Sequence, residues 1–159
     1  MADYDFFVIG IGSSAGGFEP LKTIVGNLPS SINAAFIVVQ HIPAERESHL
    51  PSILRKLTTL TVVSVETIEY IEPGHIYVMA AGKQIKIKDR MIFVESRSPE
   101  DKINRTIDHC FQSMATQVKD KSIGIILSGA GYDGPEGAKA IEDNNGLVTY
   151  KILLPLNFR

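Results

Sequence analysis

The feature that most constrains this chain is an apolar run that breaks into a turn of small residues near its start. Residues 6–17 read as a strand, a tight turn and the approach to a helix that begins near Phe18. Residues 12–16 fit the pattern G-x-S-x-G, in which small residues permit a sharp turn that exposes a serine hydroxyl, here that of Ser14. Free N–H groups at the start of the helix suit an oxyanion as well as a phosphate. The turn alone therefore leaves ester hydrolysis and nucleotide binding open.

Strand-like and helix-like segments alternate along most of the chain. Continuous apolar runs predict strands over residues 34–39, 61–65, 122–127 and 147–150, and helical spacing predicts helices over 18–28, 48–60, 107–118 and 137–141. This alternation favours an α/β fold with a parallel sheet and helices on both of its faces. Three short segments, 75–79, 84–88 and 90–94, interrupt it and predict antiparallel hairpins at one edge.

Size and composition exclude several classes of protein. A length of 159 residues suits one domain, and a net charge of −2 without a dense basic run gives no footprint for nucleic acid or an anionic membrane. Cys110 is the single cysteine, so an internal disulfide is impossible, and the start does not resemble a signal peptide. We therefore expect a cytoplasmic protein without membrane insertion. Cys110, Phe111 and Met114 lie on a helical apolar stripe and are expected in the core.

Three residues that could do chemistry follow predicted strands. Ser14 comes after the first strand, His41 directly follows the second, and Asp133 lies in a Gly-rich loop after residue 127. Because the carboxyl ends of parallel strands share one edge of a sheet, we expect these side chains at one rim. A serine needs a base to become nucleophilic, and an imidazole needs an acceptor that fixes its tautomer. Ser14, His41 and Asp133 fit these roles.

Each of the three residues also has a structural interpretation. Ser14 could simply form the turn, His41 could be a satisfied structural group, and Asp133 could make an Asx-turn or cap a helix. The combination is what favours a catalytic site, although the order Ser, His, Asp differs from that of the α/β-hydrolases. The other histidines, His49, His75 and His109, are expected to be structural.

Nucleotide binding is the second hypothesis. Read from Gly10, the turn also matches G-x-G-x-x-A, the dinucleotide pattern. That pattern needs an acidic residue at the end of the second strand, where this chain has Gln40 and His41, and no Gly-Lys-Ser/Thr follows the glycines. Metal-ligand spacings are missing as well. We therefore predict no cofactor and no metal.

Four segments together resemble a known family, the catalytic domain of the CheB-type chemotaxis protein-glutamate methylesterases and glutamine deamidases. They are GIGSSAGG (10–17), QHIP (40–43), PGHIY (73–77) and LSGAGYDG (127–134), and the likeness runs in order from about residue 6 to residue 150. The resemblance implies a doubly wound, mainly parallel, Rossmann-like three-layer sandwich. It also implies methyl ester hydrolysis and glutamine deamidation on the signalling helices of chemotaxis receptors. Turn geometry and resemblance place backbone N–H groups near Ala15 and Ala130 in the oxyanion hole.

The chain departs from the resembled family in three places. Ala130 stands where the family often has Met, an Arg beyond the histidine is not at its usual position, and the C-terminus is short. A receiver domain does not precede residue 6, and the loop over residues 45–51 resembles modules fused to receptor methyltransferases. Regulatory modules are therefore expected outside this chain.

The end of the sequence carries a separate expectation. Residues 147–159 stop where the resembled domain continues, and they include the apolar side chains of Leu153, Leu154, Leu156 and Phe158. We expect one domain, residues 1–159, that folds with reduced or absent esterase activity and forms a homodimer through this region. The alternative is that the tail adds an edge strand and activity is normal.

Overall fold

The chain forms a six-stranded parallel sheet with helices on both faces. The computed structural model describes residues 3–13, 18–41, 49–98, 103–127 and 132–151. The sheet has the order β3-β5-β2-β1-β8-β9, and every neighbouring pair is parallel. Its strands are β1 (Phe7–Ser13), β2 (Ala34–Gln40), β3 (Thr61–Val65), β5 (His75–Met79), β8 (Ser122–Leu127) and β9 (Leu147–Lys151).

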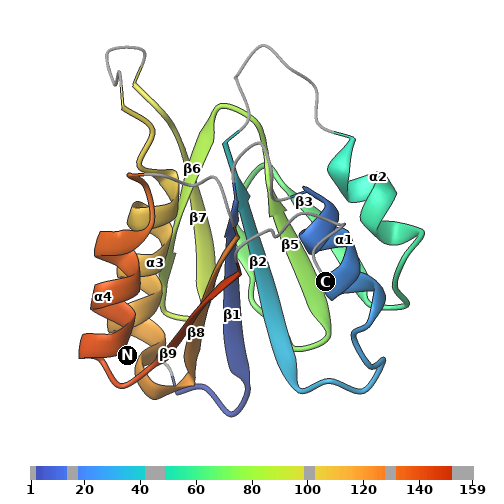
Figure 1. Cartoon of the computed structure of the whole chain (residues 1–159), viewed down its shortest axis with the longest axis horizontal. Coiled ribbons are helices and arrows are strands. Elements are labelled where there is room, and N and C mark those ends of the chain that lie inside the picture. Colours follow the sequence, from blue (N-terminus) through green and yellow to red (C-terminus); the bar gives the residue numbers. More distant parts are fainter. Residues whose placement is uncertain (1–2, 14–17, 42–48, 99–102, 128–131, 152–159) are drawn as a thin grey trace, which may run out of the picture.

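Two pairs of helices complete a three-layer sandwich. In Figure 1 the sheet lies between α3 and α4 on the left and α1 and α2 on the right. The helices are α1 (Phe18–Gly26), α2 (Leu50–Arg55), α3 (Thr106–Val118) and α4 (Pro135–Asp143), and a short 3-10 turn, η1 (Lys119–Lys121), joins α3 to β8. Strands are added outward from β1 on both of its sides, so the sheet is doubly wound. The predicted fold class is confirmed.

A small antiparallel sheet accompanies the main one. It has the order β4-β7-β6 and consists of β4 (Glu69–Tyr70), β6 (Lys83–Lys88) and β7 (Met91–Ser96). Ile85 and Ile87 on β6 are buried, and the Ile87 N–H donates to Ser113 Oγ of α3 at 2.8 Å. Lys86 and Lys88 alternate with them and are exposed, as expected for a strand with one wet face.

One predicted hairpin strand belongs elsewhere. Residues 75–79 were expected in the antiparallel edge, but β5 lies inside the parallel sheet between β3 and β2. Residues 76–79 are all buried, which is typical of a strand covered on both faces. The strand that precedes β5 in the chain, β4, is only two residues long and pairs with β7, not with β5. The short apolar pattern showed a strand but carried no information about its direction.

β1 includes the first two glycines of the small-residue segment. Gly10 and Gly12 lie inside the strand, paired with Ile37 and Val39 of β2. Their missing side chains let α3 approach, because a Cβ at Gly12 would lie 2.7 Å from Ile107 Cγ2. These two glycines therefore serve close packing between strand and helix, and they do not form the turn.

The second helix is also shorter than predicted. The spacing predicted a helix over residues 48–60, whereas α2 ends at Arg55, and Leu57 is 36% exposed. Two β-branched residues follow, and the side chain of Thr58 accepts a hydrogen bond from the Leu60 N–H at 3.1 Å. Such local bonding competes with helical hydrogen bonds.

The predicted core stripe of α3 is confirmed. Cys110, Phe111 and Met114 are completely buried, and burial raises the pKa of the Cys110 thiol to about 12. A C-terminal cap follows α4, because Gly146 N–H bonds to Ile141 C=O at 2.9 Å and Asn145 has a φ of 70°. No helix within the described ranges is long and apolar enough to cross a membrane.

Candidate active site

The carboxyl ends of β1, β2 and β8 lie side by side and form the rim of the site. β1 pairs with β2 on one side and with β8 on the other. The N–H of His41 donates to the C=O of Ser13 at 3.2 Å, which extends this pairing one residue beyond β2. The backbone of His41 is therefore fixed beside the residue that precedes Ser14 in the sequence. Ser14, Ala15 and Ala130 lie outside the described residues.

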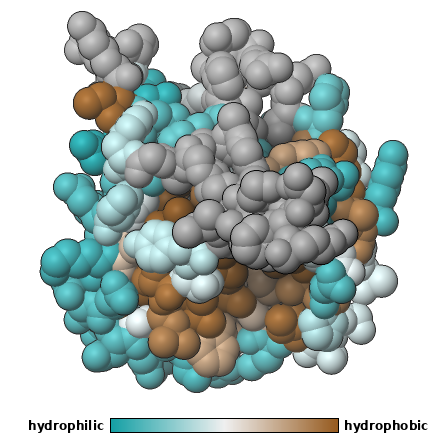
Figure 2. Space-filling view, viewed as in Figure 1, coloured by the Kyte–Doolittle hydropathy of each residue, from teal (hydrophilic) through white to brown (hydrophobic). Residues whose placement is uncertain are grey.

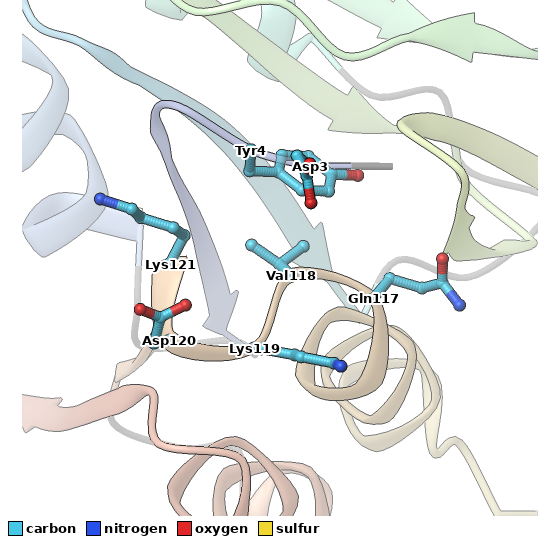
Figure 3. A pocket seen from close by; sticks show the side chains of 7 residues that line it. All are labelled: Asp3, Tyr4, Gln117, Val118, Lys119, Asp120 and Lys121. Carbon is cyan, nitrogen blue, oxygen red and sulfur yellow. The ribbon is translucent and has the colours of Figure 1, made fainter. Parts of the chain in front are cut away.

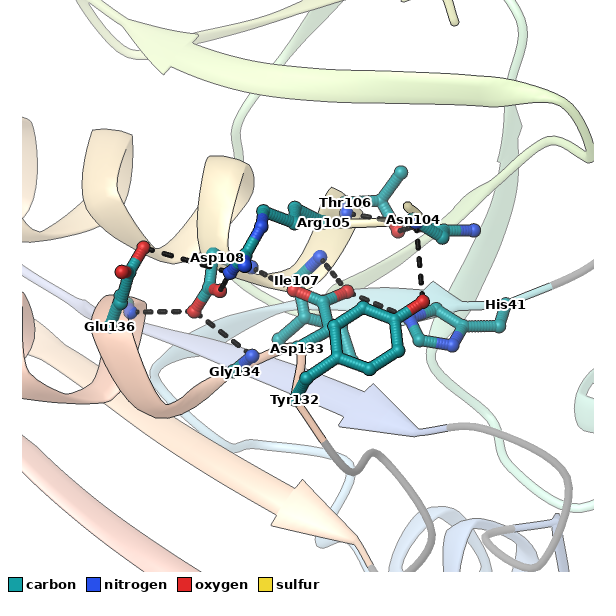
Figure 4. Close-up of polar contacts among 11 residues, drawn as sticks. His41, Asn104, Arg105, Thr106, Ile107, Asp108, Tyr132, Asp133, Gly134 and Glu136 are labelled. Atoms are coloured by element: carbon teal, nitrogen blue, oxygen red, sulfur yellow. Dashed lines mark hydrogen bonds and ion pairs between the residues drawn. The ribbon is translucent and has the colours of Figure 1, made fainter. Parts of the chain in front are cut away.

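The structure brings His41 and Asp133 together. His41 Nε2 lies 2.7 Å from Asp133 Oδ2, although 92 residues separate the two in the sequence (Figure 4). The side chain of His41 is 19% exposed, whereas that of Asp133 is completely buried. A buried carboxylate beside an imidazole fixes the tautomer with the proton on Nε2, which leaves the lone pair on Nδ1. The expectation that these two residues meet at one rim is confirmed.

Asp133 is anchored by the first turn of α3. Its Oδ2 accepts the N–H of Ile107 and its Oδ1 accepts the N–H of Asp108, both at 2.8 Å. These N–H groups have no partner inside the helix, and the helix dipole favours a negative charge at this end. Asp133 therefore caps the first turn of α3 and contacts His41 with the same carboxylate.

Asn104 and Tyr132 make further hydrogen bonds at the start of α3. Asn104 Oδ1 accepts the Thr106 N–H at 3.0 Å and the Thr106 hydroxyl at 2.8 Å. The N–H of Asn104 in turn donates to the hydroxyl oxygen of Tyr132 at 3.2 Å. The side chain of Tyr132 is otherwise 54% exposed and the Arg105 guanidinium lies 5.9 Å from its ring centre. An exposed aromatic ring thus borders the His41–Asp133 pair.

A second buried carboxylate, that of Asp108, lies behind Asp133. Its Oδ1 accepts the N–H groups of Gly134 and Gly137, at 2.9 and 2.8 Å, at the start of α4. Burial raises the pKa of Asp108, the Gly137 N–H opposes this rise, and the nearby Asp133 carboxylate adds to it. Sequence reasoning missed Asp108. The available signal was its position on the apolar stripe of the helix, three residues before Phe111.

Ser13, the neighbour of Ser14, has a structural role. Its side chain is completely buried, and its Oγ accepts a hydrogen bond from Gln40 Nε2 at 3.1 Å. This contact joins the ends of β1 and β2. Gln40 occupies the position at which a dinucleotide site would carry an acidic residue, and its side-chain amide is bonded to Ser13.

The other three histidines lie in or next to three different elements. His75 is the first residue of β5 and so lies at the amino end of that strand, where its Nδ1 bonds to Pro73 C=O at 3.0 Å and its ring stacks on Tyr77. His109 pairs with Glu95 at 2.9 Å on the surface. His49 precedes the first residue of α2. These contacts agree with the predicted structural roles.

A separate hollow of about 450 Å³ lies at the amino ends of β1 and β8 (Figure 3). Its lining includes Tyr4, Val118 and Lys121. Ligands of open parallel sheets bind at the carboxyl ends of the strands, which is the opposite end from this hollow. The rim that carries His41 and Asp133 is therefore the candidate site.

The sequence matches to curated relatives extend over most of this chain. It is 35% identical over 147 residues to a Leptospira interrogans protein whose name proposes protein-glutamate methylesterase and protein-glutamine glutaminase activities, covering 92% of this chain and 75% of that protein. It is 33% identical over 147 residues to a Thermotoga maritima protein-glutamate methylesterase/protein-glutamine glutaminase, covering 89% of this chain and 42% of that one. The chain thus spans three quarters of the first relative and less than half of the second.

A solved structure and a family model give the same result. The crystal structure of the Thermotoga maritima CheB methylesterase catalytic domain matches with a TM-score of 0.79 and 30% identity, over 91% of this chain and 78% of the solved chain. The family model for CheB methylesterase matches residues 9–151. The chain therefore belongs to the CheB methylesterase family.

Proposed function

We propose that this chain hydrolyses methyl esters of glutamate side chains and deamidates glutamine side chains, with Ser14, His41 and Asp133 as a catalytic triad. The observation that carries the proposal is the 2.7 Å contact between His41 Nε2 and the buried, helix-capping carboxylate of Asp133. Such a pair is what a serine nucleophile needs as its base. The names of the relatives support the two reactions.

The reaction follows from the roles of the three side chains. Ser14 Oγ attacks the carbonyl carbon of the ester while His41 Nδ1 takes the hydroxyl proton, and Asp133 stabilises the imidazolium that forms. The imidazolium then protonates the leaving methoxide, so methanol departs and an acyl-enzyme remains. A water molecule attacks the acyl-enzyme with His41 as base, which releases the glutamate and Ser14. Glutamine reacts in the same way with ammonia as the leaving group.

The charge on the tetrahedral oxygen needs donors close to Ser14. Backbone N–H groups of Ala15 and Ala130 are the proposed donors, since both residues follow strands that end at the rim. The start of α1 at Phe18 adds the positive end of a helix dipole nearby in sequence.

The proposed substrate is the signalling helix of a chemotaxis receptor, because the family acts on receptor glutamates. The exposed ring of Tyr132, which borders His41 and Asp133, is suited to contact a substrate helix. Residues 1–159 would act as one catalytic domain in the cytoplasm. A receiver module or a receptor methyltransferase would be a separate partner outside this sequence.

A nucleotide-binding or otherwise non-hydrolytic module is not favoured. Gly10 and Gly12 lie inside β1 and pack against α3, so they do not form a phosphate-binding turn. The end of β2 carries Gln40 engaged with Ser13 in place of an acid for a ribose hydroxyl.

Self-association through the outer edge of the sheet is a further part of the proposal. β9 is the last strand of the described sheet, and its Leu147 and Tyr150 are 66% and 58% exposed. Figure 2 shows hydrophobic side chains gathered in the lower middle of the face on which Figure 1 places β8 and β9. Ile123 and Ile125 of β8 are only partly buried. Unpaired strand edges and exposed apolar side chains favour pairing with a second copy.

Replacing Ser14 tests the proposed nucleophile. Ser14→Ala should lower methanol release from methylated receptor by several orders of magnitude, because nucleophile and base act as a unit. The parent should be labelled by a fluorophosphonate probe and the variant should not. Ser13→Ala is the matched control, since the Ser13 hydroxyl is buried and bonded to Gln40. Methanol release at the parent rate from Ser14→Ala would disprove the mechanism.

A further inference from the structure

Two aspartates, Asp108 and Asp133, each cap the start of the helix to which the other one belongs or leads. Asp133, which precedes α4, accepts the N–H groups of Ile107 and Asp108 in the first turn of α3. Asp108, which lies in that turn, accepts the N–H groups of Gly134 and Gly137 at the start of α4. Figure 4 shows the two carboxylates next to each other between the helices. Each helix is thus capped by an acid from the other segment.

We propose that Asp108 is a positioning residue that holds Asp133 in register with His41. This inference rests on the proposed function, because the geometry that it protects is that of the catalytic base. Asp108 itself is not a catalytic residue, since its carboxylate points at α4 and does not contact His41.

The contacts explain how Asp108 acts through Asp133. The backbone N–H of Asp108 fixes Asp133 Oδ1 at 2.8 Å, while its carboxylate fixes the N–H of Gly134, the next residue in the chain, at 2.9 Å. Asp133 is therefore held at its carboxylate and at its backbone by the same residue. Asp133 Oδ2, which bonds to Ile107 N–H, is the oxygen that meets His41 Nε2.

The backbone conformation around Gly134 depends on these bonds. Gly134 has a φ of 121°, a backbone conformation that residues with a side chain rarely adopt. Its N–H donates to the carboxylate of Asp108. A Cβ at Gly137 would lie 2.5 Å from Phe111 Cβ and 3.1 Å from Asp108 Cα. Glycine at this position lets α4 approach close enough for the second bond to Asp108.

Burying a second acid beside Asp133 needs compensation. Asp108 is 2% exposed, and its one cationic neighbour among the described residues is Arg105, 3.4 Å away with a half-exposed side chain. The two charge-assisted bonds to α4 and the dipole of that helix supply further stabilisation. The bonds to the N–H groups of Gly134 and Gly137 are contacts that an apolar side chain could not make.

The test compares Asp108→Ala, Asp108→Asn and the control Asp143→Ala. Alanine removes the acceptor, whereas asparagine keeps an oxygen for both N–H groups. Asp143 is a carboxylate on α4 whose side chain is 61% exposed and bonds to Lys139. We expect Asp108→Ala to lower kcat for methanol release by about 10- to 100-fold with KM nearly unchanged, because misplacement by about 1 Å has effects of this size. Asp108→Asn should recover most of that loss, and Asp143→Ala should match the parent.

Proton NMR provides a readout that does not depend on turnover. The far-downfield Nε2–H signal of His41, assigned by its loss in His41→Ala, reports the bond to Asp133. We expect this signal to be lost or broadened in Asp108→Ala and retained in Asp108→Asn. If the parent has no esterase activity but the signal follows this pattern, the positioning role stands and the proposed function fails.

A folded Asp108→Ala protein with the parent kcat and the parent signal would overturn the proposal. So would an Asp108→Asn variant with the same loss as Asp108→Ala, because the retained oxygen should then have been sufficient. If Asp108→Ala does not fold, Asp108→Ser takes its place, because the shorter hydroxyl side chain cannot reach both N–H groups.

Discussion

His41 is the residue on which the site converges. Its backbone N–H extends the β1–β2 pairing, and its ring bonds to an acid that follows β8. Its position is thus determined by three adjacent strands of the sheet. Because its backbone and its ring are both held, His41 is preorganised and loses little freedom when a substrate binds.

His41, at the carboxyl end of β2, and His75, at the amino end of β5, should respond differently to truncation. His41→Ala should lower kcat/KM by a factor of about 10² to 10⁴, the usual contribution of a general base. His75→Ala should stay near the parent value, because the His75 ring bonds to Pro73 C=O, lies near Glu72 and stacks on Tyr77. Methanol release is measured for both variants at matched thermal stability.

The pH profile supplies a control for this comparison. The parent should lose activity on the acid side, because a protonated imidazole cannot accept the serine proton. The residual activity of His41→Ala should lack this limb. Equal losses in both histidine variants at unchanged stability would contradict the assignment of the base.

Sequence reasoning at this scale found residues at strand ends and missed residues that act through helix ends. Strand patterns and the carboxyl-end rule are enough to bring His41 and Asp133 to one rim. The N–H donors of Ile107 and Asp108 were not predictable, because they depend on where α3 begins relative to the loop after β8. A tertiary contact of this kind leaves no periodic signal in the sequence.

At the scale of elements, α3 connects the core to the site. Its middle packs on Gly10 and its first turn packs on Gly12 through Ile107, while that same turn caps Asp133. A displacement of α3 would therefore move the Asp133 carboxylate, which bonds to His41.

The end of α4 offers a test of helix termination. Asn145 has a φ of 70°, a conformation that costs residues other than glycine about 1–2 kcal/mol. Asn145→Ala should lower Tm by a few degrees, at about 2–4 °C per kcal/mol for a domain of this size, and Asn145→Gly should leave it unchanged or raise it. Thermal unfolding followed by circular dichroism measures both. A higher Tm for alanine than for glycine would rule out this cap.

The order of the elements was predictable, and the neighbours of the short strands were not. Long periodic segments such as α3, and continuous apolar runs such as β2, show their type directly. β5 is five residues long, and its pattern is equally compatible with a hairpin and with a central parallel strand. Its position between β3 and β2 depends on contacts distant in sequence.

For the whole molecule, the exposed edge at β9 predicts concentration-dependent dimerisation. Leu147→Lys should shift the protein toward monomer in light scattering, because a charge at a strand edge opposes pairing with another strand. Ile68→Lys is the matched control, since Ile68 is 53% exposed but lies outside β9. A parent protein that stays monomeric at all concentrations would refute the proposed self-association.

The separation of 92 residues between His41 and Asp133 has a consequence for the growing chain. Closing so long a loop has a cost in chain entropy. This cost must be met before the contact between His41 and Asp133 can form and stabilise the fold. During synthesis the N-terminal part of a domain leaves the ribosome first, so Ser14 and His41 emerge well before α3 and Asp133. If the proposed triad is correct, an incomplete chain carries the serine and the imidazole without the acid that orients them, and esterase chemistry begins only when both sides of the sheet have been assembled.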